Sequence, residues 1–147
     1  MTAMEERWIP CNVRRFQAPK ATLYGVQSFV GPSPYDVPEA ISVATDQTRN
    51  LLVISFRYLE PEKTEAVPIR KGVVFHVGHR TRRIYAIEIS ATNVKKREAL
   101  EKAVGEAVEA VSRYTPDRIQ RRENFKAAKQ AVENNADQLV RFAVAAV

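Results

Sequence analysis

The spacing of apolar residues changes once along the chain, and this change limits the folds open to it. From Glu39 to Ser90 apolar and polar residues alternate, a period of two that predicts strands with one buried face. From about Thr92 the apolar residues recur with a period of 3.6, which predicts helices with one apolar stripe. The chain therefore changes from sheet to helix once, as in an α+β fold.

Five strands are predicted between Glu39 and Ser90, read from "AISVAT", "NLLVISFRYLE", "EAVPIR", "GVVFHV" and "RIYAIEI", with the last two joined around "GHRTR". Pro68 confines the third of these to an edge or a bulge, because proline cannot donate to a ladder. The short connections favour an antiparallel meander of four or five strands. In the last hairpin, we expect Val73, Phe75 and Val77 to share the core face with Tyr85, Ile87 and Ile89, while His76, Ile84 and Glu88 take the other face.

Two helices are predicted between 92 and 146, forming a C-terminal helical hairpin. The first has an apolar stripe of Leu100, Val104, Ala107, Val108 and Val111. The second has Phe125, Ala128, Val132, Ala136, Leu139 and Ala143 on one side. Thr115 is a good N-cap for the second helix, with Pro116 at its first position, and "ENNAD" is a candidate bend. Residues 39–147 are thus expected to form one α+β domain.

Residues 1–38 read as an irregular N-terminal arm. Five prolines and scattered aromatic residues argue against a regular helix, although the aromatic content is high for a disordered tail. The stretch "ATLYGVQSFV" could add a strand. Two roles stay open for the arm: packing on its own core, or lying on a partner chain.

The single cysteine, Cys11, cannot form an internal disulfide. The first residues lack a signal-peptide pattern, and no apolar run is long enough to cross a bilayer. We therefore expect a cytoplasmic protein, or a virion protein if the chain is phage-derived. Its style is bacterial or phage-like.

Positive charge is concentrated in one segment, from Arg70 to Arg97. The net charge is +6, and this segment alone holds eight basic residues and one acidic residue. One group of cations lies at a predicted hairpin tip: Arg80, Arg82 and Arg83. A second group, Arg70, Lys71, Lys95, Lys96 and Arg97, is expected about 20 Å away, around the start of a helix. Free N–H groups there suit an anion, while simple solvation of these side chains is the plain alternative.

The two histidines of "HVGH" do not predict a metal site. Side chains separated by an odd number of residues on a strand point to opposite faces, and no third ligand lies close in sequence except Glu88. His76 beside Glu88 is more typical of a hydrogen-bonded surface pair. No phosphate loop, nucleophile elbow, CxxC or HExxH motif is present. No metal, cofactor or catalytic residue is predicted.

Three function classes follow. The first is a non-enzymatic protein that binds nucleic acid or an acidic protein surface through Arg70–Arg97. The second is a structural or assembly subunit of a homo- or hetero-oligomer that docks through its N-terminal arm. The third is a small enzyme that uses His76 and Glu88.

Part of the strand region resembles the DUF2283 family of small bacterial proteins. The resemblance covers "ISVATDQTRNLLVISF" and "GVVFHVGHRTRRIYAIEIS", with Ile87, Glu88 and Ile89 at the closing motif. Ala86 stands where that family usually has glycine, and the turn is basic instead of acidic. The resemblance implies the meander and no particular activity.

Overall fold

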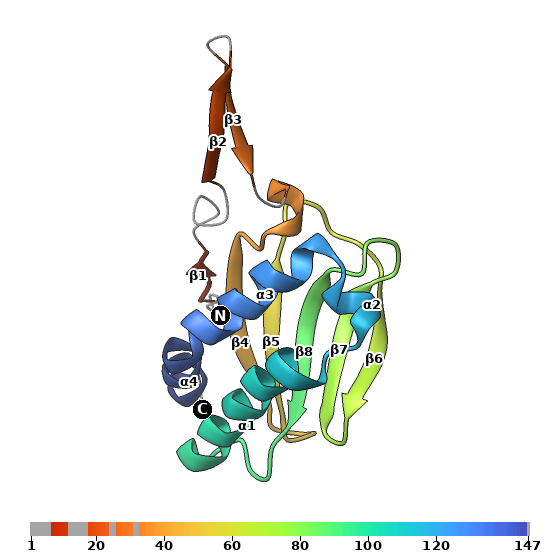
Figure 1. The fold of residues 1–147 in the computed structure, drawn as a ribbon. Helices are drawn as coiled ribbons and strands as arrows, with labels where there is room; N and C mark the ends of the chain where they lie inside the picture. The colour runs from red at the N-terminus through yellow and green to blue at the C-terminus, as the bar shows by residue number, and fades with distance from the viewer. Residues whose placement is uncertain (1–6, 12–17, 24–25, 31–32, 147) are drawn as a thin grey trace.

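A six-stranded antiparallel sheet forms one layer of the protein, and helices form the other (Figure 1). The computed structural model describes residues 7–11, 18–23, 26–30 and 33–146. The strands of the sheet, in spatial order, are β1 (Ile9–Pro10), β4 (Ala40–Asp46), β5 (Leu51–Arg57), β8 (Ile84–Ser90), β7 (Val73–Gly78) and β6 (Thr64–Arg70). The predicted antiparallel α+β fold is confirmed. One connection departs from a simple meander, because the loop after β5 crosses to the far edge to begin β6.

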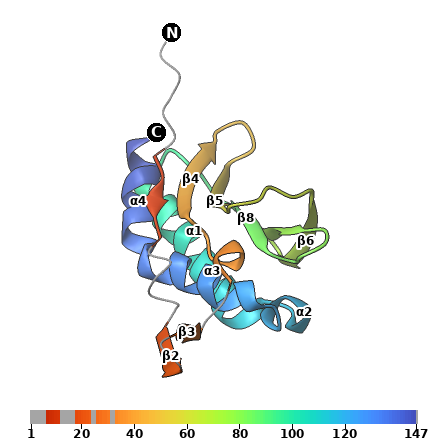
Figure 2. The ribbon, with the colours of Figure 1, turned by 90° about the horizontal axis from the view of Figure 1, so that it is seen from above.

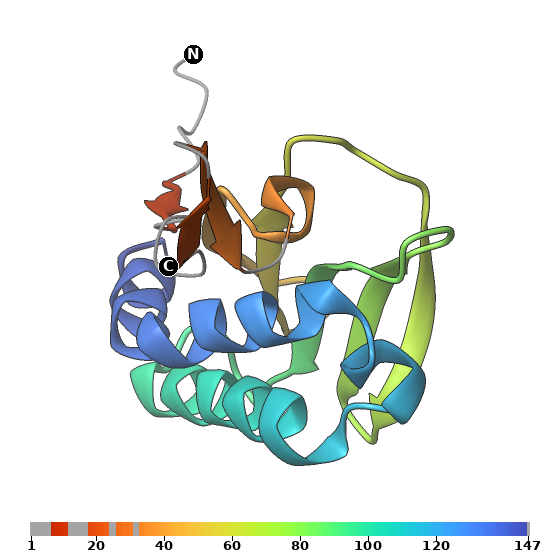
Figure 3. The ribbon, with the colours of Figure 1, turned by 45° about the horizontal axis from the view of Figure 1, so that its top comes forward.

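The helices follow the sheet in the sequence and all lie against one of its faces, as the view from above shows (Figure 2). They are α1 (Arg97–Glu109), a π-helical turn η3 (Ala110–Tyr114), α2 (Asp117–Gln120), α3 (Glu123–Asn134) and α4 (Ala136–Ala145). The helices α1 and α3 lie side by side (Figure 3). Within the described part of the chain no helix is long and apolar enough to cross a membrane.

The core lies between these two layers. Alternate residues of β5 are fully buried, Leu52 and Ile54 among them, and they meet the buried stripe of α1. At about 25 cal/mol per Å², burial of such side chains is the main stabilising contribution to folding. The opposite face of the sheet carries no helix in the described structure.

A β-bulge changes which residues of the last hairpin reach the core. The pairing shifts between His76 and Val77, so that Val77 lies opposite Ile84. Ile84 is therefore fully buried, while Tyr85 is only half-buried. The prediction that Tyr85 lies on the core face and Ile84 on the opposite face is wrong, because the extra residue of a bulge reverses the alternation of side chains.

Thr115 ends one helix instead of starting the next. Its buried hydroxyl donates to the carbonyl oxygens of Ala110 and Val111, at 3.0 and 3.3 Å, and so satisfies groups at the end of the π turn. No side chain caps α2, whose N-cap position is Pro116. The predicted second helix also divides into α2, α3 and α4, with the last break at Asn135 in the predicted "ENNAD" bend.

The N-terminal arm is attached to the body at both of its ends. Near its start, Ile9 is buried and pairs with Ile41 of β4, and the Cys11 N–H donates to the Glu39 carbonyl at 2.8 Å. Near its end, Val37 is fully buried just after the 3₁₀ turn η2 (Pro34–Asp36). Between these anchors the chain forms a two-stranded hairpin, β2 (Ala18–Leu23) and β3 (Val26–Val30). The predicted strand "ATLYGVQSFV" thus corresponds to parts of two strands.

A buried polar cluster centred on Asn124 connects four parts of the fold. The Asn124 side chain is 1% exposed. Its Oδ1 accepts from the Ile84 N–H at 2.9 Å, and its Nδ2 donates to the Asp36 carbonyl at 2.8 Å and to Tyr58 Oη at 2.7 Å. The Tyr58 hydroxyl in turn donates to the Ile84 carbonyl at 2.7 Å. Helix α3, strand β8, the end of β5 and the arm are thereby held together.

Replacing Asn124 tests the importance of this cluster. We expect Asn124→Ala to lower the free energy of unfolding by roughly 3 kcal/mol, because buried partners lose their hydrogen bonds. Chemical denaturation measures this change. The control is Asn134→Ala, the same substitution at an exposed position of α3. Equal effects of the two substitutions would contradict the assigned role of Asn124.

Candidate functional site

The turn between β7 and β8, which carries Arg80, Arg82 and Arg83, binds a carboxylate of the protein itself. Glu62 Oε1 accepts hydrogen bonds from the N–H groups of Arg80 and Thr81, at 2.5 and 2.9 Å. Its Oε2 accepts from the Thr81 hydroxyl at 2.5 Å. A Cβ at Gly78 would meet this carboxylate and the Thr81 hydroxyl, so a larger residue there would displace Glu62 from the turn. The turn is therefore an anion-binding loop whose anion is internal.

The other arginine side chains of this turn also have internal partners. Arg83 is largely buried, and its Nε lies 2.8 Å from Asp36 Oδ1. Arg82 pairs with Glu65 of β6, and His79 lies 3.6 Å from the same carboxylate. The positive charge of Arg82 and Arg83 thus stabilises contacts within the fold, while the Arg80 side chain is exposed.

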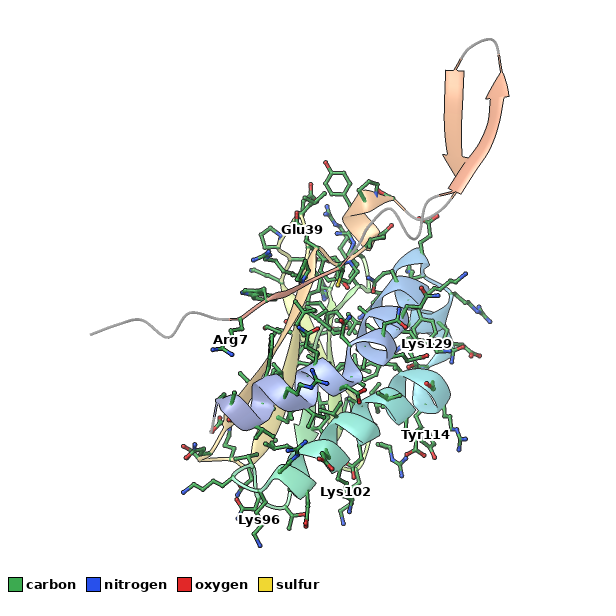
Figure 4. All side chains as sticks on the ribbon, turned by 90° about the vertical axis from the view of Figure 1, so that its left-hand side faces the viewer. Arg7, Glu39, Lys96, Lys102, Tyr114 and Lys129 are labelled. Atoms are coloured by element: carbon green, nitrogen blue, oxygen red, sulfur yellow. The ribbon has the colours of Figure 1, made fainter. Side chains whose placement is uncertain are left out.

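The second group of predicted cations is divided between the two ends of α1. Arg70 lies at the C-terminal end, with its guanidinium 4.3 Å from the Tyr114 ring centroid and 3.9 Å from Glu109. Lys95, Lys96 and Arg97 lie at the N-terminal end, and Figure 4 shows Lys96 and Tyr114 at opposite ends of this helical run. The 13 residues of α1 place its two ends about 18 Å apart. Arg70 therefore does not flank the helix start as expected, and Lys71 is exposed beyond the end of β6.

The start of α1 is the part of the basic segment that keeps free donors. Lys96 occupies the N-cap position without a side-chain hydrogen bond, and Arg97 is the first helical residue. Arg97 pairs with Glu101 at 2.9 Å and borders a shallow groove shared with Asp137 and Arg141. Lys95 and Lys96 are exposed and have no ion pair among the described residues. Lys71 and Arg80 are also exposed and without an ion pair among the described residues, but of these four cations only Lys95 and Lys96 lie beside the N–H groups of a helix's first turn, where an anion is favoured.

His76 and Glu88 form the expected pair on the face of the sheet away from the helices. His76 Nε2 lies 2.9 Å from Glu88 Oε1, and both side chains are about one-quarter exposed, at 27% and 25%. Over residues 7–11 and 33–146, where side chains are described, no three His, Cys, Asp or Glu residues gather as a metal site would require. The two side chains form a close pair that is an ion pair only when His76 is protonated, and no hydrogen bond of good geometry satisfies His76 Nε2 in the described structure.

Two features of these surfaces escaped sequence reasoning. The carboxylates that occupy the arginine turn come from distant segments, and Asp36 precedes Arg83 by 47 residues, so no local pattern links them. The β2–β3 hairpin extends away from the two layers (Figure 1), and its only sequence signal was the short strand-like stretch around Tyr24 and Gly25.

No protein-family model, curated protein or solved structure matches this chain. The resemblance to the DUF2283 family therefore stays a prediction. The function has to be argued from the surfaces themselves.

The Glu62 contact makes a prediction about pH. Burial alone would raise the pKa of the Glu62 carboxyl, but hydrogen bonds from Thr81 and Arg80 outweigh it and hold the pKa below its ordinary value. A lowered folded-state pKa gives stability that is present above the unfolded pKa of about 4.3 and is lost as pH falls through the folded value. We expect Glu62→Gln to be less stable than wild type by about 1 kcal/mol at pH 7, with the difference shrinking in acid.

Denaturation at a series of pH values measures this difference. The control is Glu60→Gln, an exposed carboxylate in the same loop. A Glu62→Gln deficit that stays constant from neutral to acid pH would show that the carboxylate charge is not what holds the turn.

Proposed function

We propose that this protein is an assembly subunit that docks its β2–β3 hairpin on a neighbouring subunit. The observation that carries the proposal is the pairing of the hairpin. In the described parts of the chain, β2 and β3 pair with each other and with no strand of the main sheet. The hairpin extends beyond the body in two perpendicular views (Figures 1 and 4).

An isolated two-stranded hairpin is poorly stable in water. Three or more strands, or packing on a helix, are generally needed for stability. Its outer edges also present backbone groups that another strand can pair with. A neighbouring protein surface would supply the missing contacts and stabilise the hairpin.

The attachment of the arm favours docking over a loosely tethered tail. Cys11 and Glu39 are hydrogen-bonded across the base of the segment, and Arg83 and Asn124 hold Asp36 on the other side. Long excursions between fixed ends are uncommon in compact domains unless they serve a function. Fixed ends also lower the entropy lost when the hairpin is immobilised on a partner.

Removal of the hairpin tests the proposal. We expect replacement of residues 12–32 by a short Gly/Ser linker to dissociate the oligomer into monomers, because the docking element is lost. The body should keep its cooperative thermal unfolding, since both anchors remain. Light scattering after gel filtration measures the mass, and circular dichroism measures unfolding.

The control inserts the same linker between Tyr24 and Gly25, which keeps both strands in the chain. An oligomer that survives removal of residues 12–32, or a wild-type chain that is monomeric at all accessible concentrations, would contradict the proposal.

Anion binding at the start of α1 is a second candidate function, favoured by the free donors beside Lys95 and Lys96. With a nucleic-acid ligand, we expect the double variant Lys95→Ala/Lys96→Ala to bind more weakly. The slope of the logarithm of the binding constant against the logarithm of the salt concentration should also become shallower by about 1 to 2. Fluorescence anisotropy with labelled duplex DNA measures this slope. The matched control, Arg118→Ala/Lys126→Ala, removes the same charge from exposed positions in α2 and α3. Equal losses in both variants would assign the binding to net charge and not to this site.

A further inference from the structure

Among the residues that the structure describes, one edge of the main sheet is unpaired along most of its length. Strand β1 pairs with β4 only at Ala40 and Ile41. Strand β4 continues to Asp46, and beyond Ile41 its outer edge pairs with no other strand in the described structure. The open stretch is thus Ser42–Asp46, at the side of the sheet where the arm already enters.

The backbone direction shows which residues of β4 offer hydrogen bonds at this edge. The Glu39 carbonyl accepts from Cys11 on the β1 side. Successive residues of an antiparallel strand present their N–H and C=O groups to opposite neighbours. Ile41, Val43 and Thr45 therefore face the outer edge, whereas Ser42 and Ala44 face β5.

The opposite edge of the sheet is protected, and this asymmetry is informative. Strand β6 contains Pro68, a register shift next to it, and the charged residues Glu65 and Arg70. Proline, bulges and charges are the usual devices that prevent pairing at an edge. The open stretch of β4 contains none of them before Asp46, whose carboxylate accepts from Thr48 and Arg49 in the following turn.

We propose that the open edge of β4 receives the β2–β3 hairpin of a second copy of this chain. This inference rests on the proposed function and names the receiving surface. The hairpin strands have six and five residues, enough to pair along Ser42–Asp46. Each copy then offers one hairpin and one open edge, so the contact is head-to-tail and produces a ring or a filament. The added strand extends the sheet by β-augmentation.

Hydrogen exchange tests the receiving surface residue by residue. In the assembled protein we expect the amides of Val43 and Thr45 to be protected. In the variant that lacks residues 12–32, these two amides should exchange at least about tenfold faster. The amide of Ala44, which faces β5, should keep its protection and serves as the internal reference. Unchanged exchange at Val43 and Thr45 would overturn the inference.

Proline substitution tests the same edge by affinity. Thr45→Pro removes a donor that faces outwards and leaves the bonds to β5 in place, so we expect the dissociation constant to rise about tenfold or more. Thr45→Val keeps the N–H and is the first control. Ala66→Pro is the second, because the hydrogen bond from His79 N–H to the Lys63 carbonyl places Ala66 on the outward side of β6.

Mixing the two defective proteins makes the decisive experiment. At a concentration between the dissociation constants of wild type and Thr45→Pro, neither the hairpin-replaced chain nor Thr45→Pro should associate alone, but each retains the half that the other lacks. Their mixture should form a one-to-one heterodimer, detected by light scattering. A mixture that stays monomeric would overturn the head-to-tail contact.

The outcomes separate this inference from the proposed function. If removal of the hairpin dissociates the oligomer but Thr45→Pro assembles as wild type does, docking stands and β4 is not the receiver. If Thr45→Pro lowers only the stability of the monomer, the edge is covered by the chain's own N-terminal residues, and the inference is overturned.

Discussion

The side chain of Asn124 is the contact on which the arrangement of the fold depends. Burying an amide without partners is costly, but every polar atom of this amide is hydrogen-bonded. Its oxygen accepts from the Ile84 N–H, and its nitrogen donates to the Asp36 carbonyl and to the Tyr58 hydroxyl. These partners belong to three segments far apart in sequence. The fully satisfied cluster therefore determines where α3 crosses the sheet and where the base of the arm lies. The break between α2 and α3 permits this, because it starts α3 beside β8.

Pairing within the fold also changes the interpretation of the basic segment, Arg70–Arg97. A cluster of eight cations suggests a polyanion partner when only the sequence is considered. In the fold, Arg70, Arg82, Arg83 and Arg97 each pair with a carboxylate. The turn carrying Arg80 surrounds Glu62 through its backbone. Charge that is paired contributes less to an external field, which leaves Lys71, Arg80, Lys95 and Lys96 as the exposed cations of this segment without an ion pair among the described residues. Of these, only Lys95 and Lys96 lie beside the N–H groups of a helix start.

The sequence was sufficient for features that depend on local periodicity. Alternation identified β5 because Leu52, Ile54 and Phe56 all face the helices, and the stripe through Leu100 and Val104 identified α1. The sequence was insufficient where a partner strand or a distant side chain determines which residues are buried or hydrogen-bonded. The bulge that buries Ile84 arises from pairing with β7, and Thr115 satisfies either helix by local rules. Its hydroxyl is committed to Ala110 and Val111 only in the packed structure.

In the described part of the chain, the β2–β3 hairpin lacks a third strand and the outer edge of β4 lacks a neighbour beyond Ile41. These two features are complementary, and the proposed association through backbone pairing rests on them. The most direct measurement is the mass of the wild-type protein by light scattering at low and high salt, with ultraviolet absorbance recorded to detect nucleic acid. The account predicts an oligomer that persists in high salt and carries no nucleic acid. A monomer that carries nucleic acid and releases it in salt would contradict it.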